Sequence, residues 1–307
     1  NGLYSEFDAN FFNQLSGKNN PGGGVPSNGL NGILATRAFF PVLGNHEYPG
    51  QDPTVIPAAY LDSFSLPVPS GVAPVDAERY YSFDSGNAHF VVIDSERFLG
   101  SAPTNRLSEM LAWLDADLAA TTKTWRVVFL HRTIFASSSH GTYGDTATNN
   151  RMRAQLAPIL QNRGVQLVMF GHDHAYQRSK RLRVDGGGKI VRDGSNNVVD
   201  SNTGIVYVLS GHGGADLYGC NADPYALFGS TKYNNYVSLY GDGYDFVATR
   251  NGAAVLFSAG GTDCTGLPTT PTERYGFTQV AITGATLSLT TYNFNGVVMD
   301  QFSMPAN

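Results

Sequence analysis

The sequence predicts an α/β fold built in layers, and three observations support this prediction. Buried strands alternate with amphipathic helices between residues 79 and 174, strand and loop patterns dominate from about residue 180, and polar clusters follow several apolar strands. Strands that alternate with helices form a parallel sheet with helices packed against it. No internal repeat or linker divides the sequence, so we expect one domain over residues 1–307 with a β-rich second half.

The first part of the chain predicts one helix and one short strand. Apolar residues recur at helical spacing over Phe7–Leu15, and a loop rich in Gly, Asn and Pro follows. Residues 38–43, with the sequence AFFPVL, have the length of a short buried strand that leads into Gly-Asn-His-Glu. Residues 50–78 are rich in proline, which predicts irregular structure.

Four further segments predict strands. Residues 79–96 predict a hairpin with a turn at Asp84–Asn87. Residues 125–131 and 165–174 begin with short apolar runs that are typical of buried strands. Residues 275–304 alternate between apolar and polar side chains around a turn, which predicts an antiparallel hairpin.

Two helices are expected between these strands. Residues 150–164 predict a helix that ends at Gly164, a residue type favoured after a helix C-terminus. Residues 106–121 predict an amphipathic helix with one apolar face. The residues of that face are Leu107, Met110, Leu111, Leu114 and Leu118.

Composition limits the classes of function. The chain has 42% hydrophobic and 15% charged residues and a net charge of -5 without a basic stripe, which argues against nucleic acid as a main partner. No apolar run reaches the roughly 18 residues that a membrane span needs. Lysine is scarce while Asn and Thr are abundant, so we expect a secreted, periplasmic or cell-surface protein. Cys220 and Cys264 would then form a disulfide, with two free thiols as the alternative.

Three polar clusters follow predicted strands. They are Asn45–Glu47, His131 and His172–His174. A single histidine after an apolar strand is usually structural, but the carboxyl ends of parallel strands share one edge of a sheet, where α/β folds bind ligands. Gly44 and Gly171 precede two of the clusters and let the backbone approach a ligand closely. We therefore expect these side chains to form one site.

The donor types indicate a metal site. Neutral imidazoles and an amide oxygen suit divalent ions of intermediate hardness, such as zinc, manganese or iron. His172 and His174 stand two positions apart, at a predicted strand-to-loop turn. On such a turn they can reach two neighbouring ions, so the sequence predicts room for a pair of metals.

The motifs GNHE, a strand ending in His131, and GHDHAYQRS resemble three of the five motifs of the metallophosphoesterase (calcineurin-like phosphoesterase) superfamily. Their form is that of its purple acid phosphatase-like branch, and the resemblance extends over nearly the whole chain. It implies a layered α/β/β/α sandwich. It also implies hydrolysis of small phosphate esters, in which a metal-bound hydroxide attacks phosphorus, with a phosphomonoesterase of the acid phosphatase type as the expected enzyme.

The resemblance implies metal ligands residue by residue. Asn45, His131 and His172 match the ligands of one ion, and His174 matches a ligand of the other. Tyr4 is a candidate for the tyrosine that ligates ferric iron in purple phosphatases. The cofactors implied are two divalent or mixed-valence ions, Fe, Zn or Mn, with Ca or Mg as alternatives.

Other residues are candidates for contact with the substrate. His46 matches the histidine that contacts the phosphate and protonates the leaving group. His140 stands where plant-type relatives carry a substrate-facing histidine, with an ordinary loop histidine as the alternative. His212 follows another apolar strand and is a candidate for the pocket rim. His89 is expected to pack within the hairpin or to make a cross-strand contact, and Asp94 to be a turn residue, with the orientation of a neighbouring residue as the alternative.

The first two motifs of the superfamily, which carry aspartate ligands, are absent from this sequence. We therefore expect an N-terminally truncated domain that lacks its first strands, with the missing segment as a possible separate chain. Without those carboxylates, two cations about 3.5–4 Å apart would repel each other. A permuted chain with Gly241-Asp242 as the missing motif is an alternative.

Two further functions stay open. One is a phosphodiesterase or nucleotidase of the same superfamily, which differs in the shape of its pocket. The other is a non-catalytic extracellular protein that retains the fold with an incomplete metal site. The missing aspartates favour this second alternative.

Overall fold

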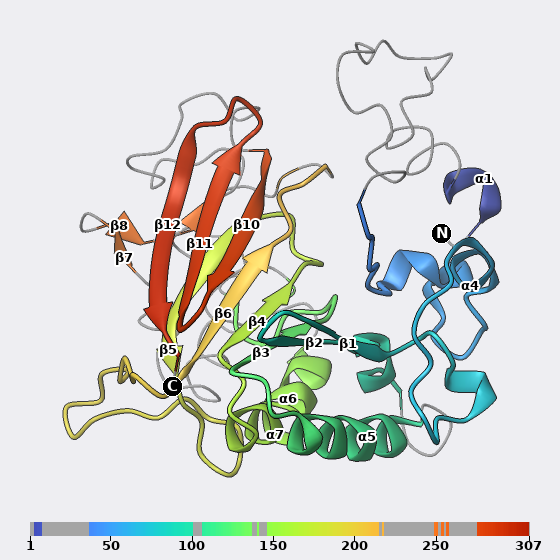
Figure 1. Cartoon of the computed structure of the whole chain (residues 1–307), viewed down its shortest axis with the longest axis horizontal. Helices are drawn as coiled ribbons and strands as arrows, with labels where there is room; N and C mark the ends of the chain where they lie inside the picture. The colour runs from blue at the N-terminus through green and yellow to red at the C-terminus, as the bar shows by residue number, and fades with distance from the viewer. Residues whose placement is uncertain are drawn as a thin grey trace.

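The computed structural model describes residues 3–7, 37–100, 106–136, 140, 146–214, 217, 249–250, 253–254, 256–257 and 275–306. Its centre is a seven-stranded sheet with the strand order β1-β2-β3-β4-β6-β5-β9 (Figure 1). The strands are β1 (Tyr81–Ser85), β2 (Ala88–Val92), β3 (Trp125–Phe129), β4 (Leu167–Phe170), β5 (Tyr176–Leu182), β6 (Ile205–Ser210) and β9 (Leu256–Phe257).

Four strands in the middle of this sheet are parallel. β2 pairs with β3, β3 with β4, and β4 with β6, whereas β1 and β5 pair antiparallel with their neighbours. The helix α5 (Leu107–Ala120) connects β2 to β3, and α6 (Thr146–Gln155) and α7 (Ala157–Asn162) lie between β3 and β4. The hairpin predicted over residues 79–96 and the predicted alternation of strands and helices are both confirmed.

The helices cover one face of the sheet. The buried residues of α5 include Met110, Leu114 and Leu118, which join one apolar cluster with Val128 and Val168 of the sheet. Each such aliphatic side chain contributes roughly 1.5–3 kcal/mol by leaving water. The spacing of apolar residues therefore predicted the buried face of α5 correctly, although Leu111 is only partly buried.

The helix predicted over residues 150–164 is divided into α6 and α7. Pro158 has no N–H to donate to a carbonyl one turn earlier, and it stands in the first turn of α7, where that donor is not needed. Gly164 follows α7 with φ +67°, and its N–H bonds the Gln161 carbonyl at 3.1 Å. The N–H of Val165 reaches back to the Leu160 carbonyl at 3.0 Å, which completes a Schellman motif. The predicted helix end is confirmed.

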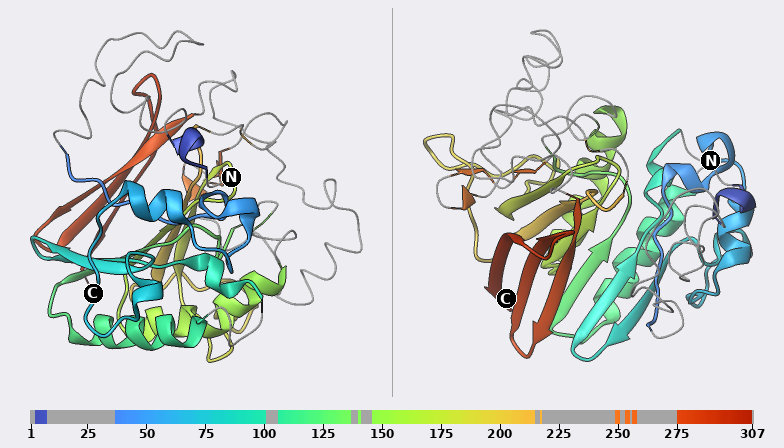
Figure 2. Two further views of the ribbon diagram at one scale, coloured as in Figure 1. Left: turned by 90° about the vertical axis from the view of Figure 1, so that its right-hand side faces the viewer. Right: turned by 90° about the horizontal axis from the view of Figure 1, so that it is seen from above.

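A three-stranded antiparallel sheet packs on the other face of the large sheet (Figure 2). It consists of β10 (Gly276–Thr283), β11 (Thr286–Asn293) and β12 (Val298–Pro305). Alternate residues of β11 face inward, and Leu287 and Leu289 join a second apolar cluster with Val127 of the large sheet. The described layers are thus helices, large sheet and small sheet, which confirms the predicted layered α/β fold.

The predicted strand at residues 38–43 is wrong, because no strand forms there. Pro41 has no N–H to offer a neighbouring strand. Its carbonyl accepts hydrogen bonds from the hydroxyl groups of Tyr60 at 3.0 Å and Tyr81 at 2.7 Å. Side chains therefore hold this segment in place of a backbone ladder.

The remaining elements are short, as the proline-rich sequence predicted for residues 50–78. They are α1 (Tyr4–Phe7), α4 (Ala58–Ser63), the 3-10 helices η2 (Asn45–Glu47), η3 (Pro49–Gln51), η4 (Pro74–Asp76) and η5 (Ser95–Phe98), and the paired strands β7 (Thr249–Arg250) and β8 (Ala253–Ala254). Most of the predicted helix Phe7–Leu15 lies outside the described residues. None of the helices in the described part of the chain has the length and apolar character that a membrane span requires.

Candidate metal centre

Each of the four parallel strands is followed by a polar side chain at the same position. Asp94, His131, His172 and His212 stand two residues after the last residues of β2, β3, β4 and β6, respectively. Because these strands are parallel, their carboxyl ends meet at one edge of the sheet. The sheet therefore delivers three histidines and one carboxylate to the same edge.

Three of the predicted ligands converge at this edge. The Nε2 atom of His131 lies 2.8 Å from Asn45 Oδ1 and 3.0 Å from His172 Nδ1. The two imidazole rings meet edge to face, with centroids 4.8 Å apart. Donors about 2.1 Å from a metal ion stand about 3 Å apart at neighbouring positions of an octahedron. Both separations from His131 Nε2 therefore match those between neighbouring ligands of one ion.

The hydrogen-bonding chemistry of this trio also favours a cation. The Nδ2 atom of Asn45 donates to Gln51 Oε1 at 2.7 Å, which turns the acceptor Oδ1 toward His131. A proton on either imidazole nitrogen can bridge only part of the trio, and at least one close pair then lacks a hydrogen bond. One divalent ion would accept all three lone pairs, so the donor set fits a metal ion.

The charge state of His131 agrees with a role as a ligand. Burial lowers its pKa well below the usual range, and the positive charges of His172 and Arg132 act in the same direction. His46 and His174 lie close enough to lower the pKa of His131 further. The imidazole is therefore neutral at physiological pH, the form that coordinates metals.

The backbone beside the cluster leaves little freedom. A Cβ atom at Gly44 would stand 2.7 Å from His131 Nδ1, so only glycine fits there. His172 has φ +69°, in the left-handed region that a residue with a side chain rarely adopts. Such strain is typical of functional sites, where the surrounding structure holds the residue in place.

Three other histidines lie at or near the cluster. The His140 ring centroid lies 4.4 Å from that of His172, and the His140 N–H donates to Asp173 Oδ1 at 2.9 Å. His46 is exposed on η2, directly after Asn45, and His174 is half-buried. The structure thus gathers the predicted residues of the site from loops after β3 and β4 and from η2.

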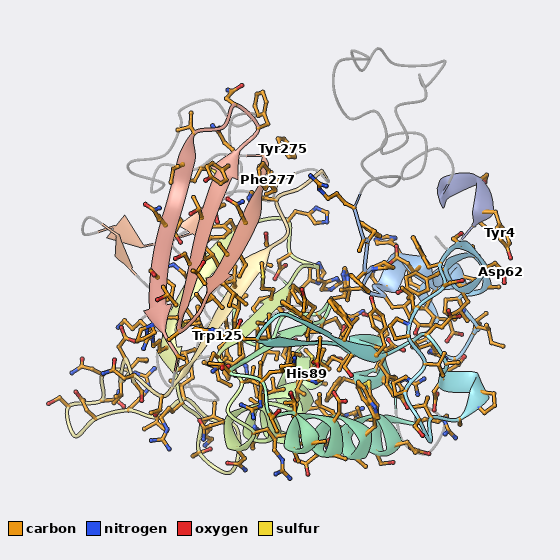
Figure 3. All side chains as sticks on the ribbon, viewed as in Figure 1. Tyr4, Asp62, His89, Trp125, Tyr275 and Phe277 are labelled. Atoms are coloured by element: carbon orange, nitrogen blue, oxygen red, sulfur yellow. The ribbon has the colours of Figure 1, made fainter. Side chains whose placement is uncertain are left out.

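Three predicted residues lie elsewhere or outside the described chain. Figure 3 shows Tyr4 beside Asp62, whose carboxylate accepts a hydrogen bond from the Tyr4 hydroxyl and raises the pKa of Tyr4. Tyr4 is exposed on α1, and no described contact links it to the cluster. Cys220 and Cys264 lie outside the described residues. The predicted roles of Tyr4 and the two cysteines stay predictions.

His212 is buried and turns toward the small sheet. Its ring meets that of Tyr176 edge to face, with centroids 5.3 Å apart, and its carbonyl accepts from the Gly276 N–H. Both ring nitrogens lack hydrogen-bond partners within the described residues. Burial lowers the pKa of His212 to about 4, so the ring is neutral. Its predicted contact with substrate stays a prediction.

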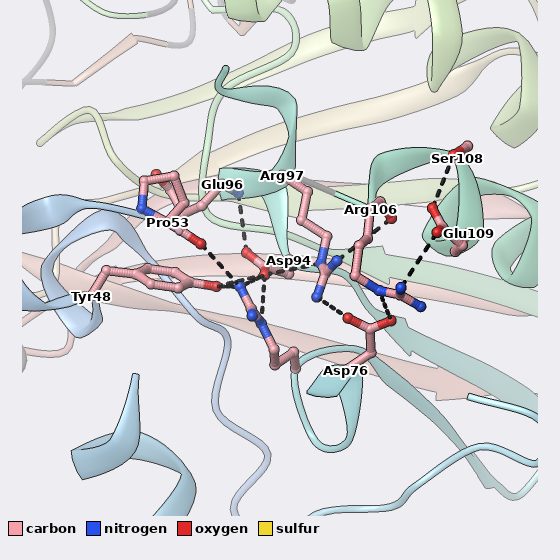
Figure 4. A network of polar contacts seen from close by, with 10 residues as sticks. Tyr48, Pro53, Asp76, Asp94, Glu96, Arg97, Arg106, Ser108 and Glu109 are labelled. Atoms are coloured by element: carbon pink, nitrogen blue, oxygen red, sulfur yellow. Dashed lines mark hydrogen bonds and ion pairs between the residues drawn. The ribbon is translucent and has the colours of Figure 1, made fainter. Parts of the chain in front are cut away.

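Sequence reasoning missed Ser95 and Glu96, which form a buried segment with Asp94 beside the cluster. Asp94 Oδ2 accepts from the Tyr48 hydroxyl at 2.6 Å and forms an ion pair with Arg79 at 3.2 Å (Figure 4). Ser95 Oγ accepts from the backbone N–H groups of His131 and Arg132 at 3.2 and 2.9 Å. Asp94 thus orients neighbouring side chains, which was the alternative to the turn residue that we expected. The rule that identified the histidines, a polar residue after a buried strand, applies to it equally.

The donor set is neutral and incomplete for two ions. Within the described residues, no three His, Cys, Asp or Glu side chains form a group that could hold a metal. The trio of Asn45, His131 and His172 adds an amide to two imidazoles. These residues fit one divalent ion, and the described part of the chain completes no such group for a second.

A family model described as calcineurin-like phosphoesterase matches residues 19–176, which include the whole trio. The chain belongs to this family. Among curated relatives, purple acid phosphatase 17 of Arabidopsis thaliana is 31% identical over 187 residues, covering 58% of this chain and 50% of that protein. Purple acid phosphatase 18 of the same plant is 26% identical over 186 residues, covering 59% and 37%.

The chain spans half or less of these relatives. An uncharacterized protein of Mycobacterium tuberculosis is 28% identical over 192 residues, covering 58% of this chain and 35% of that protein. Among solved structures, a purple acid phosphatase from yellow lupin (Lupinus luteus) seeds aligns with a TM-score of 0.48 and 17% identity, covering 81% of this chain and 35% of the lupin chain. The sequence relatives support the predicted purple acid phosphatase-like branch.

Proposed function

We propose that this protein hydrolyses phosphate esters, with small phosphomonoesters as its substrates. The observation that carries the proposal is the convergence of Asn45, His131 and His172 at the carboxyl edge of a parallel sheet. Membership of the calcineurin-like phosphoesterase family supports the class of reaction. The similarity to purple acid phosphatases supports monoesters over diesters.

Two metal ions would complete the site in this proposal. When bound, they supply Lewis-acid activation of the phosphate ester and of water. Asn45, His131 and His172 hold the first ion through one amide oxygen and two ring nitrogens. His174, near enough to influence the pKa of His131, contributes to the second. Iron, zinc and manganese match these donors best.

Two histidines handle the phosphate and the leaving group. His46 is exposed next to Asn45, so it can reach a substrate that the site holds. We assign it the proton donor to the departing oxygen, a role that suits an imidazole near neutral pH. His140, whose ring packs near that of His172, is the second candidate for contact with the phosphate.

The test is turnover of p-nitrophenyl phosphate and of its bis-ester by the metal-loaded protein. The monoester should be hydrolysed faster, and His172→Ala should remove at least about 99% of the activity because a metal ligand is lost. Full activity in the His172→Ala variant would refute the assigned site. Faster hydrolysis of the bis-ester, or of nucleotides in the same assay, would support a phosphodiesterase or nucleotidase.

One observation favours a second function, that of a non-catalytic protein with the same fold. The described residues hold no complete group of three acidic, histidine or cysteine ligands. Metal analysis after saturation with Zn²⁺ separates the two proposals. About two ions per chain supports the hydrolase, and none supports the non-catalytic protein.

We also propose a location outside the cytoplasm and a disulfide between Cys220 and Cys264. The low lysine content and the presence of only two cysteines support both. Thiol titration of the denatured protein should find no free thiol without reductant and two with it. Two free thiols in both conditions would contradict the disulfide.

A further inference from the structure

The segment after β2 contacts two of the three chain segments that form the candidate metal centre. Asp94 binds Tyr48, which directly follows Asn45–Glu47. Ser95 accepts hydrogen bonds from the backbone of His131 and of the following residue. Three consecutive side chains, Asp94, Ser95 and Glu96, are fully buried. Side chains so placed are held rigidly, because burial of a polar group is stabilising only when its partners are in position.

Glu96 forms a buried ion pair with Arg132. Its Oε2 atom accepts from Arg132 NH2 at 2.8 Å and from Arg132 Nε at 3.0 Å, and Oε1 accepts from Nε at 2.9 Å. The side chain of Glu96 is 0% exposed and that of Arg132 is 7% exposed. A paired contact of this kind fixes the plane of the guanidinium group.

The same guanidinium group reaches the cluster. Arg132 directly follows His131, and its NH1 atom lies 3.4 Å from His172 Nε2. His172 Nδ1, on the same ring, faces His131 within the trio. One imidazole ring therefore separates a permanent positive charge from the place where the trio would hold a cation.

This arrangement raises an electrostatic conflict that the ion pair with Glu96 relieves. A guanidinium group stays protonated under all physiological conditions. Beside a divalent ion it repels the metal, and a protein interior screens that repulsion much less than water does. A carboxylate in direct contact with the guanidinium group cancels most of this field.

We propose that Glu96 is a positioning residue of the metal centre, which neutralises Arg132 and so permits a cation to bind beside it. The inference rests on the proposed function, because it requires that the trio binds a metal ion. It goes beyond that function by assigning a role to a residue that does not contact the metal. Arg132 lies beside the outer side of the His172 ring, and Glu96 offsets its positive charge there.

The test is calorimetric titration of the full chain with Zn²⁺ at pH 7. Glu96→Gln keeps the shape of the side chain but removes its charge. We expect the affinity for Zn²⁺ to fall at least about tenfold, the range found when partners of metal ligands are changed. The double variant Glu96→Gln/Arg132→Gln removes both charges and should recover most of that loss.

A matched control removes a different buried ion pair. Asp76 forms an ion pair with Arg97 at 2.5 Å with both side chains buried, and no described contact links either residue to the trio. Asp76→Asn should lower the thermal midpoint of unfolding, as Glu96→Gln does, because each removes one carboxylate partner of a buried arginine. It should leave the affinity for Zn²⁺ within about threefold, since Asp76 makes no described contact with the trio.

The outcomes separate this inference from the proposed function. If the unaltered chain binds no Zn²⁺, the proposed function fails and the inference fails with it. If the unaltered chain binds Zn²⁺ and folded Glu96→Gln binds it equally well, only the inference is overturned. A double variant that binds no better than Glu96→Gln also overturns it, because the loss is then not one of charge balance.

A single variant covers the case in which Glu96→Gln does not fold. Arg132→Gln removes the repelling charge itself, so the inference expects the affinity for Zn²⁺ to be equal to or higher than that of the unaltered chain. A loss of tenfold or more would overturn the inference. In that case the guanidinium group would serve the site directly.

Discussion

Two histidines at opposite ends of the parallel strands have pKa values that are shifted in opposite directions. His131 follows the carboxyl end of β3 and faces Asn45 and His172. His89 lies near the amino end of β2, with Nδ1 2.8 Å from Asp84 Oδ1 and Nε2 2.8 Å from Asp117 Oδ2 (labelled in Figure 3).

The surroundings of each ring decide its charge. Burial alone would lower the pKa of His89, but hydrogen bonds and charges of Asp117 and Asp84 outweigh burial and raise it. The pKa of His131 is lowered by burial first, and then by the neighbouring His172 and Arg132. The carboxylates thus favour the protonated form of His89, which joins the hairpin to α5, whereas the surroundings of His131 favour its neutral, metal-binding form.

The largest difference between the two ends should appear on removal of each ring. His131→Ala should lower both the affinity for Zn²⁺ and phosphate ester hydrolysis at least about 100-fold, because it removes a ligand. His89→Ala removes an imidazole at the other end and should change neither by more than about threefold. Equal losses in the two variants, measured by calorimetry and p-nitrophenyl phosphate turnover, would contradict the different roles assigned to His131 and His89.

A smaller effect on activity is expected from substitution of Gly44 or Gly171, the two glycines that lie beside the His131 ring. The added Cβ in Gly44→Ala would stand 2.7 Å from His131 Nδ1 and displace the ring. A displacement of about 1 Å costs up to about 100-fold in rate, so we expect a loss between about tenfold and 100-fold.

Gly171→Ala is the matched variant for this position. Its Cβ would lie 3.9 Å from the same nitrogen, an ordinary contact, so its effect should be much smaller. Steady-state kinetics of both variants provide the measurement. Equal activities of the Gly44→Ala and Gly171→Ala variants would show that a Cβ atom at Gly44 fits beside the His131 ring, which would contradict the close contact in the structure.

The smallest expected effect concerns stability and depends on pH. Because folding raises the pKa of His89 above its unfolded value of about 6.5, the stabilisation is complete below about pH 6.5 and is lost as the pH rises through the folded-state value. His89→Gln should therefore lower the free energy of unfolding by about 1–3 kcal/mol at pH 5. The loss should be smaller at pH 9.

Urea denaturation at the two pH values measures this difference. Asp84 on β1, Asp117 on α5 and Lys123 beyond α5 are the charged groups around His89, and Lys123 Nζ lies 3.6 Å from Asp84 Oδ2. A loss that is equal at pH 5 and pH 9 would show that His89 is not charged in the folded protein.

Local sequence patterns predicted one helix and the positions of two histidines. Apolar spacing identified α5, and the position after β3 and β4 identified His131 and His172. Both features depend only on residues that are close in sequence. The strand predicted at residues 38–43 is wrong, and Pro41 is the only local sign of this in the sequence. Hydroxyl groups of two tyrosines bind the Pro41 carbonyl there, in place of backbone hydrogen bonds between strands.

The supporting contacts could not be predicted from local pattern. Glu96 and Arg132 lie 36 residues apart, and their pairing depends on the parallel register of β2 and β3. For His89, the partner Asp84 is its cross-strand neighbour in the hairpin, a contact of the kind that the sequence offered, whereas Asp117 comes from α5 and could not be predicted. Long-range ion pairs of this kind follow from the tertiary structure, not from sequence spacing.

The central claim is that Asn45, His131 and His172 converge to hold one divalent cation. Anomalous diffraction at the zinc absorption edge, from crystals of the protein grown with Zn²⁺, tests this claim most directly. The account predicts a peak about 2.0–2.2 Å from Asn45 Oδ1, His131 Nε2 and His172 Nδ1. A zinc-bound crystal with no peak among these three atoms, and peaks only elsewhere on the chain, would contradict it.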